Sequence, residues 1–324
     1  MTPDPSPAPI EQTATVPATL AGTRLDRAAA ELFPEHSRAR LQAWIEAGVL
    51  TVDGRPGEGK KKLAGGERLH LRVQPAATGD WLAEDLPLEI VHEDADILVI
   101  DKPMDLVVHP AAGHEHGTLV NALLHHDPSL ATLPRCGIVH RIDKDTTGLL
   151  VVARTLEAHT ALVRQLQDKS VWREYEAVAG GIVARDGKVE APIGRHPVDR
   201  KKMAVTVGGK PAVTHYTVLQ RFRAHTHLRL KLETGRTHQI RVHMAHIKHP
   251  LVGDPLYGGR AVLPPYCGEA LAAALRDFPR QALHATRLGL VHPRSGEFMG
   301  WHSPLPDDFV CLLDLLAEDM RQNA

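Results

Sequence analysis

Cysteine is scarce in this chain of 324 residues, and no apolar run approaches the length of a membrane span. The three cysteines, Cys136, Cys267 and Cys311, lie far apart without any C-x-x-C pair, which excludes a disulfide framework and a thiolate zinc site. The apolar run from Leu149 to Ala153 is strand-sized, whereas a spanning helix needs about 18 residues. The start of the chain has neither a basic segment nor an apolar block of signal-peptide length. We therefore expect a cytoplasmic protein without a membrane partner.

The net charge is also small, at -1, but basic and acidic residues are concentrated in different segments of the chain. Residues 195–260 carry thirteen lysines and arginines against three acidic residues, and eight histidines besides. Residues 19–75 have a net charge of +3, and residues 1–18 have one of -2. A chain polarised in this way can bind phosphates with one face while it stays neutral on average. A merely solvated basic surface is the alternative interpretation.

The length of the chain suits one large domain and a smaller companion. Residues 1–18 are rich in Pro, Thr and Ala and lack apolar periodicity, so we predict a flexible tail. Residues 19–75 are predicted to form a small α/β domain, with helices at Arg24–Leu32 and after a cap at Ser37, then strands in VLTVDGRP and RLHLRV. Residues 76–85 form the predicted linker, because Pro, Gly and small residues dominate there.

Residues 86–320 are predicted to form the larger domain. Candidate strands include Leu88–His92, Ile97–Asp101 and Tyr175–Val178, and a helix is expected at Leu156–Gln167. Strands and helices do not alternate strictly along this part of the chain. This order favours an α+β fold with a largely antiparallel sheet.

Four blocks of the larger domain are dense in polar residues that a core would not need. They are DKPMDLVVHP (101–110), HRIDKDTTGLL (140–150), WREYEAV (172–178) and LETGRTHQIRVHMAHIKHPLVGDPLYGG (232–259). In the second block, Asp143 lies on a loop that leads into an apolar strand, a common place for chemistry. In the third block, Arg173 and Tyr175 share one face of a strand. The fourth block gathers arginines and histidines around one helix start.

HRIDKDTTGLLVVA resembles the signature of the pseudouridine synthases that modify ribosomal and transfer RNA. REYEAV and TGRTHQIRVH with HPLVGDPLYGG match later motifs of that family in the same order. The resemblance spans residues 19–318 and is greatest to the ribosomal large-subunit pseudouridine synthase D group, because GKPAVTHYTV and RQALHATRLGLVHP are also similar. Ile142 stands where the family usually has Leu. The resemblance implies an RNA uridine isomerase that needs neither a cofactor nor a metal.

The resemblance also implies roles for individual residues. Asp143 is the carboxylate at the ribose, either as nucleophile on C1′ or as base on C2′-H. Arg241 is the cation that keeps Asp143 charged, with Arg236 as the other candidate. Tyr175 lies beside the base and helps the final deprotonation. Arg141 fills the space that the extruded base leaves in its RNA.

Residues 19–75, with SRARLQAWIEAGVLTVDGR at their centre, resemble the S4 RNA-binding domain. The resemblance implies contacts with the RNA backbone from Arg38 and Arg40 at the second helix, and from Lys60, Lys61 and Lys62 in a nearby loop. For the whole chain it implies a monomer that acts on 23S ribosomal RNA, specifically on uridines in the stem-loop called helix 69. The substrate is the free RNA or the assembling large subunit.

Each assigned role has a structural alternative. Tyr175 could be an ordinary core tyrosine with its hydroxyl at the rim. His140 and His238 suit RNA contacts or a hydrogen-bonding scaffold better than they suit catalysis. Asp145 is typical of a turn cap, as Asp commonly is before Thr and Gly.

Three competing functions are also compatible with parts of the sequence. A metal-dependent hydrolase could use His243, His246 and His249, although residues three apart drift around a helix axis. A glycosidase-like enzyme would need a second carboxylate, for which Asp145 is the near candidate. A non-catalytic ribosome-binding factor would explain the basic stretches but would leave three motifs without a role.

Overall fold

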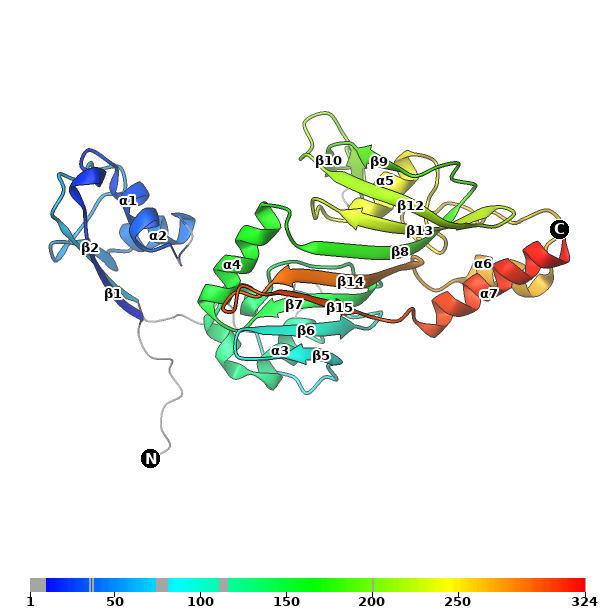
Figure 1. Cartoon of the computed structure of the whole chain (residues 1–324), viewed down its shortest axis with the longest axis horizontal. Helices are drawn as coiled ribbons and strands as arrows, with labels where there is room; N and C mark the ends of the chain where they lie inside the picture. Colours follow the sequence, from blue (N-terminus) through cyan, green and yellow to red (C-terminus); the bar gives the residue numbers. More distant parts are fainter. Residues whose placement is uncertain are drawn as a thin grey trace.

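The computed structural model describes residues 10–34, 36, 38–73, 81–110, 116–199 and 201–323. It contains a small N-terminal module and a larger domain built on a nine-stranded sheet (Figure 1). Among the described residues, no helix combines the length and apolarity that crossing a bilayer requires.

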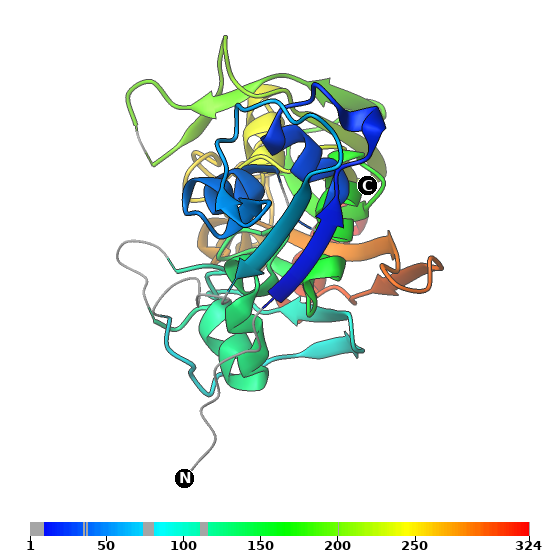
Figure 2. The ribbon, with the colours of Figure 1, turned by 90° about the vertical axis from the view of Figure 1, so that its left-hand side faces the viewer.

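The N-terminal module is a four-stranded antiparallel sheet with two helices packed on it. Its elements are β1 (Ile10–Thr15), η1 (Ala18–Leu20), α1 (Leu25–Leu32), α2 (Arg38–Glu46), β2 (Leu50–Val52), β3 (Arg55–Pro56) and β4 (Arg68–Val73), with the sheet order β1-β4-β2-β3. Leu25, Leu41, Leu50 and Leu71 are completely buried in a core of its own. Figure 2 faces this module and shows β1 and β4 side by side. The predicted helices and strands of residues 19–73 are present.

The prediction of a flexible tail over residues 1–18 is wrong for Ile10–Thr15. These residues form β1, which pairs antiparallel with β4 along its whole length. The strand was missed because it lies at the edge of the sheet, where IEQTAT buries little and shows weak apolar alternation. Val16 and Leu20, which follow it, are buried in the core of the module. Residues 1–9 and the predicted cap Ser37 lie outside the described residues.

The larger domain is built on a sheet with the order β5-β6-β7-β14-β8-β13-β12-β9, and β15 pairs with β14. Its strands are β5 (Ile90–Glu93), β6 (Ile97–Lys102), β7 (Thr147–Ala153), β8 (Trp172–Gly180), β9 (Gly187–Glu190), β12 (Val213–Arg221), β13 (His225–Leu232), β14 (Leu283–Val291) and β15 (Phe298–His302), and β10 (Ile193–Arg195) and β11 (Met203–Val205) form a separate pair. Among these strands, only β7 and β14 pair in parallel. The predicted α+β fold with a largely antiparallel sheet is confirmed.

Helices cover both faces of the large sheet. On one face lie α3 (Leu119–His126), η2 (Pro128–Thr132), η3 (Pro134–Gly137) and α5 (Gln239–His246). Leu123 of α3 and Met244 of α5 share the core of this face with Tyr175 of β8. The other face carries α4 (Leu156–Gln167) beside β7 and β14, and further along it the paired helices α6 (Glu269–Asp277) and α7 (Asp307–Gln322) (Figure 1). The candidate active-site residue Tyr175 therefore belongs to the α5 face.

The segment before β5 was expected to be a linker, but its last residues pack on the larger domain. Trp81 packs against the core that contains α3. The carbonyl of Leu82 accepts a hydrogen bond from the Asn121 amide at 2.7 Å. Residues 81–85 are thus part of the larger domain, which the predicted linker of residues 76–85 did not anticipate; residues 76–80 lie outside the described residues.

Gly148 allows β7 to join β14 directly after the loop that carries Asp143. Its φ is +106°, and a Cβ on Gly148 would lie 2.3 Å from the carbonyl oxygen of Ala285. Ala285 is the parallel partner of Gly148 in β14. A side chain at position 148 would therefore push the two strands apart just behind Asp143.

We expect Gly148→Ala to lower the free energy of unfolding by at least about 2 kcal/mol, because it adds a backbone clash to a positive φ that L residues disfavour. Urea unfolding followed by tryptophan fluorescence measures this loss. Gly296→Ala is the matched control: its φ is +73°, but a Cβ there would meet no atom within 4 Å. Its expected loss is about 1 kcal/mol. Equal losses in the two variants would contradict a special role for the contact with Ala285.

Candidate active site

Asp143 lies in a turn immediately before β7. The turn is closed by the Thr146 N–H, which donates to the Asp143 carbonyl at 3.1 Å. It is fastened from two sides: Lys102 Nζ donates to the Lys144 carbonyl at 2.7 Å, and Gln281 Nε2 donates to Thr146 Oγ1 at 2.9 Å. The carboxylate of Asp143 is therefore carried by a loop with little freedom.

Arg241 projects from α5 and joins two carboxylates. Its Nη1 lies 3.0 Å from Asp143 Oδ2, while Nε and Nη2 bind the two oxygens of Asp254 at 2.7 and 2.9 Å. The side chain of Asp254 is completely buried, and that of Arg241 is 5% exposed. Burial opposes the charge of Arg241, but hydrogen bonds and charge from Asp254, and then from Asp143, raise its pKa above the ordinary value. Asp143 thus faces a permanent cation.

Arg236, the other candidate partner of Asp143, is held elsewhere. Its Nε donates to the Pro211 carbonyl at 3.1 Å, and its backbone N–H donates to Gln239 Oε1 at 3.0 Å. It lines the same pocket as Asp143. Of the two arginines, only Arg241 contacts Asp143 within the described residues.

His238 lies between Asp143 and a tyrosine that the sequence analysis did not single out. The Tyr257 hydroxyl accepts the Met203 N–H at 2.9 Å and lies 2.8 Å from His238 Nδ1. His238 Nε2 lies 3.9 Å from Asp143 Oδ1. Burial lowers the pKa of His238 against the opposing charge of Asp143. The ring lies with Nε2 toward the carboxylate.

Tyr175 lines the pocket of Asp143 from β8, and apolar side chains of Ile142, Leu232 and Leu283 complete the wall. The tyrosine is only 6% exposed. Burial raises its pKa, and Asp143 adds to that effect although Arg173 opposes it. The hydroxyl of Tyr175 is accordingly protonated at neutral pH.

Two neighbours of Asp143 in the HRID block are placed differently. Arg141 is exposed and lines the pocket. His140 Nε2 accepts the Val151 N–H at 3.1 Å, so this ring is tied to β7. Burial, and then the nearby Arg173, lower the pKa of His140 to about 3. His140 is therefore a neutral hydrogen-bonding residue beside the pocket.

Two of the basic residues predicted for RNA contact in the N-terminal module, Arg38 and Lys61, contact the start of α1. Arg38 Nη2 lies 2.8 Å from the buried carboxylate of Asp26, and this hydrogen bond lowers the pKa of Asp26. Lys60–Lys62 are exposed, and the Lys61 carbonyl accepts the N–H of Leu25 at 2.8 Å. Arg40 belongs to α2, but its side chain lies outside the described residues. Neither Arg38 nor Lys60–Lys62 lines the pocket of Asp143.

The histidine series proposed for a metal-dependent hydrolase has other partners. His243 Nδ1 lies 2.9 Å from Thr214 Oγ1, and its Nε2 lies 3.0 Å from the Ala191 carbonyl. His249 Nδ1 lies 3.0 Å from the Gly180 carbonyl. Within the described part of the chain, His243, His246 and His249 do not form a group with the spacing of metal ligands.

Asp94, Asp96 and His292 do have such spacing, but backbone N–H groups and Arg294 already bind the two carboxylates. His292 Nδ1 accepts backbone N–H groups from Arg294 and Ser295, so its Nε2 carries the proton and faces Asp94 at 3.2 Å. Arg294 binds both oxygens of Asp96 at 2.6 and 2.8 Å. The arrangement is a hydrogen-bonded ion cluster.

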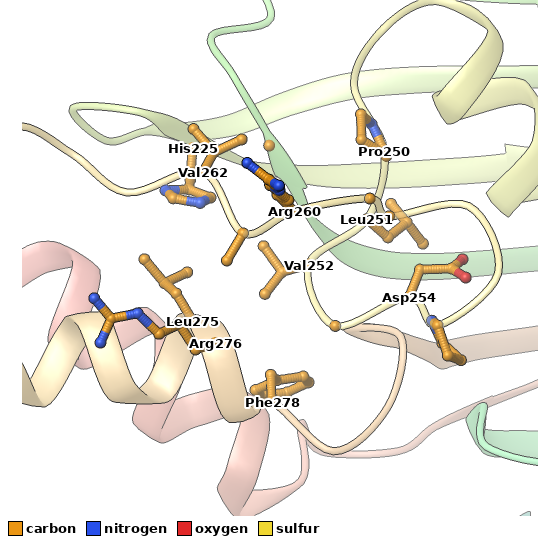
Figure 3. A pocket seen from close by; sticks show the side chains of 16 residues that line it. His225, Pro250, Leu251, Val252, Asp254, Arg260, Val262, Leu275, Arg276 and Phe278 are labelled. Carbon is orange, nitrogen blue, oxygen red and sulfur yellow. The ribbon is translucent and has the colours of Figure 1, made fainter.

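A separate pocket lies beside the loop that carries Asp254 (Figure 3). Its walls include His225, Leu251, Val252 and Phe278, whereas Asp143, Tyr175 and Arg241 do not line it. The carboxylate of Asp254 points away from this pocket in Figure 3, in keeping with its pairing to Arg241. The candidate active site is therefore the pocket of Asp143 and not this one.

Asp145 does not line the pocket of Asp143, although it lies two residues further along the chain. Asp254 is the second carboxylate close to Arg241, and both of its oxygens are bound by that arginine. The paired carboxylates that a glycosidase uses are therefore not found in the described pocket.

Sequence comparison relates the chain to a family whose description is RNA pseudouridylate synthase; this family matches residues 96–246. A protein of Pseudomonas aeruginosa named "Ribosomal large subunit pseudouridine synthase D" is 61% identical over 310 residues, which are 96% of this chain and 97% of the relative. A protein of Escherichia coli strain K12 with the same name is 53% identical over 315 residues, 97% of each chain.

Two solved structures of human proteins are similar to this chain. "Human RNA Pseudouridylate Synthase Domain Containing 4" superposes with a TM-score of 0.56 at 26% identity and covers 71% of this chain and 93% of its own. "Human RNA Pseudouridylate Synthase Domain Containing 1" gives 0.53 at 26% identity, with 74% and 96% covered.

Proposed function

The chain belongs to the RNA pseudouridylate synthase family, and we propose that it converts uridines of large-subunit ribosomal RNA into pseudouridine in the pocket of Asp143. Family membership makes it an RNA pseudouridine synthase, which is an isomerase. The observation that supports this pocket most strongly is the contact of 3.0 Å between Asp143 and the buried Arg241, with Tyr175 on the adjoining wall.

The reaction rearranges one nucleotide without adding or removing atoms. The bond between N1 and C1′ breaks, the base turns within the site, and its C5 joins C1′; the proton on C5 then moves to solvent while N1 gains one. Asp143 begins the reaction, as a nucleophile on C1′ or as a base on C2′-H. In either case Arg241 Nη1 binds one oxygen of the carboxylate, and Nε2 of His238 lies near the other oxygen.

Tyr175 and Arg141 act on the extruded base in this proposal. The ring of Tyr175 offers a platform for the uracil, and its hydroxyl relays the proton that leaves C5. Extruding the base costs a few kcal/mol, and Arg141, exposed at the pocket, fills the space that the base leaves in the RNA. Single-stranded loops, whose bases are already unstacked, are the expected targets.

The substrate in this proposal is 23S ribosomal RNA, with uridines of helix 69 as the targets. Relatives named for the ribosomal large subunit support the class of RNA. The resemblance of residues 19–75 to the S4 domain supports an RNA-binding role for the N-terminal module, in which Arg38, Arg40 and Lys60–Lys62 contact phosphates. We further propose that the enzyme acts as a monomer in the cytoplasm.

Tritium release tests the function directly. Ribosomal RNA labelled at uridine C5 is prepared from a strain without the activity, as free RNA and as large-subunit particles, and incubated with the protein. We expect label to be lost from one of these substrates, and mapping of the modified positions to place them in helix 69. Release of free uracil would favour a base-removing enzyme. Binding to both substrates without loss of label would favour a non-catalytic ribosome-binding factor.

Tyr175→Phe is expected to slow product formation about 100-fold while RNA affinity stays within about threefold, because the ring remains and the proton relay is lost. Single-turnover tritium release and filter binding measure the two effects. Tyr266→Phe is the matched control, since Tyr266 is 96% exposed and does not line the pocket. Full activity of Tyr175→Phe would show that the hydroxyl of Tyr175 does not relay the proton.

A further inference from the structure

A cavity adjoins the pocket of Asp143, and the described residues that line it include cations but no carboxylate. The two spaces share Arg141, Arg173 and Gly235. Arg135, His109 and His140 also line the adjoining cavity, and none of the described residues in its lining is Asp or Glu. Its volume is about 470 Å³, within the range of small-ligand sites. Such a composition attracts anions.

Arg173 lies where the two spaces meet, and it forms no ion pair with an acidic residue in the described part of the chain. It is 6% exposed, and its Nε is buried without a hydrogen-bond partner among the described residues. Its neighbour His140 is neutral, and burial lowers the pKa of Arg173 itself. A buried and unpaired guanidinium is strongly unfavourable unless a ligand supplies the negative charge.

The surroundings of Arg173 leave room for such a ligand. A Cβ on Gly235 would lie 2.9 Å from Arg173 Nη1, so the bare backbone of Gly235 keeps the guanidinium free of a competing side chain. His109 Nδ1 donates to the Pro110 carbonyl at 3.1 Å, which leaves Nε2 as an acceptor. This Nε2 is also buried without a partner among the described residues. An acceptor next to an anion site suits a ribose hydroxyl beside a phosphate.

We propose that Arg173 binds a phosphodiester phosphate of the RNA next to the target uridine, with Arg135 and Arg141 on the exposed side of the same cavity. This assignment rests on the proposed function, because an RNA chain that places a uridine at Asp143 must carry its neighbouring phosphate past the residues that both spaces share. A guanidinium binds phosphate oxygens through two parallel N–H groups, which fixes the register of the chain as well as adding affinity.

Arg173→Met tests the proposal in the full-length protein. We expect RNA affinity to fall about tenfold to hundredfold, as for loss of a charged hydrogen bond. The slope of log affinity against log salt should become shallower by about 0.7, the value for one phosphate contact on a single strand. The thermal midpoint without RNA should not fall, because methionine removes an unpaired buried charge. Arg321→Met, on an exposed residue of α7, should change none of these.

A lower thermal midpoint together with an unchanged salt slope would assign Arg173 a structural role and overturn the proposal. RNA with a single neutral methylphosphonate next to the target uridine gives an independent measurement. We expect the wild type to bind one methylphosphonate RNA more weakly than the unmodified RNA. Arg173→Met should bind these two RNAs with the same, already reduced, affinity. Equal losses in both proteins at every linkage would also overturn the proposal.

Two further measurements distinguish an RNA phosphate from a free anion, and the phosphate site from the proposed function. Displacement of RNA by inorganic phosphate from the wild type, without any methylphosphonate effect, would assign the cavity to a free anion and overturn the RNA contact. Tritium release by the wild type is measured on the same RNA. If the wild type releases tritium and Arg173→Met changes neither RNA affinity nor the salt slope, the phosphate site is refuted and the proposed function stands. If the wild type binds the RNA but releases no tritium, the proposed function is refuted. The methylphosphonate comparison then still tests the phosphate site.

Discussion

Asp143→Asn is expected to reduce the rate of pseudouridine formation about 10⁴-fold, because an amide can neither attack C1′ nor remove a proton from C2′. Asparagine has nearly the same shape, and Arg241 keeps both hydrogen bonds to Asp254, so the variant should fold and bind RNA as the wild type does. Single-turnover tritium release from RNA labelled at uridine C5 measures the loss, with urea unfolding as the check on folding.

Asp145→Asn is the matched control for this measurement. Asp145 lies in the same turn but does not line the pocket, so its variant should retain activity within about threefold. Label loss from Asp143→Asn at the wild-type rate would remove Asp143 from the mechanism. An equally large loss in both variants would instead favour a mechanism with two carboxylates.

Asp254→Asn is expected to lower the free energy of unfolding by about 3 to 5 kcal/mol, because it leaves the buried guanidinium of Arg241 without its bidentate partner. Asp254 Oδ1 also accepts the N–H groups of Leu256 and Tyr257 at 2.9 and 3.0 Å, and the amide oxygen of asparagine can still accept them, so the expected loss comes from the ion pair with Arg241. We further expect the remaining folded molecules to turn over about 100-fold more slowly, since Arg241 and His238 no longer hold their places at Asp143.

The control for Asp254→Asn must break an ion pair between an arginine and a buried carboxylate away from the pocket of Asp143. Asp319→Asn does so, because the side chain of Asp319 is 4% exposed, both of its oxygens bind Nη1 of Arg223 at 2.9 and 3.1 Å, and neither residue lines that pocket. It should lower stability, but turnover per folded molecule should match the wild type. If Asp254→Asn loses stability and its folded fraction still turns over at the wild-type rate, a positioning role for Asp254 is wrong.

Local sequence patterns were sufficient to predict most elements that bury one regular face. The helix at Leu156–Gln167 has the predicted bounds, and the strand at Ile97–Asp101 extends by one residue, to Lys102. The edge strand β1 was missed because only its partner β4 buries apolar residues in alternation. Apolar periodicity arises where one face of an element is buried, so an edge strand with polar side chains shows little periodicity.

The site was predictable only where a residue and its motif stand together in the sequence. Asp143, Tyr175 and Arg241 were named from motifs, and the structure brings all three to one pocket although Asp143 and Arg241 are 98 residues apart. Lys102 and Asp254 were missed, although both lie in blocks that the sequence analysis quoted. Nothing in DKP or GDP indicates that Lys102 is completely buried under the Asp143 turn or that Asp254 binds Arg241, because both contacts join distant segments.

The sharing of Arg241 between two acids has an electrostatic consequence for any route through Asp143. While both acids are ionised, the three side chains together carry one negative charge, which repels the phosphates of an arriving RNA but suits a developing oxocarbenium ion. Once Asp143 is esterified or protonated, the trio becomes neutral, and Asp254 still compensates the guanidinium. The chemical step can therefore neutralise Asp143 while the buried charge of Arg241 stays compensated by Asp254.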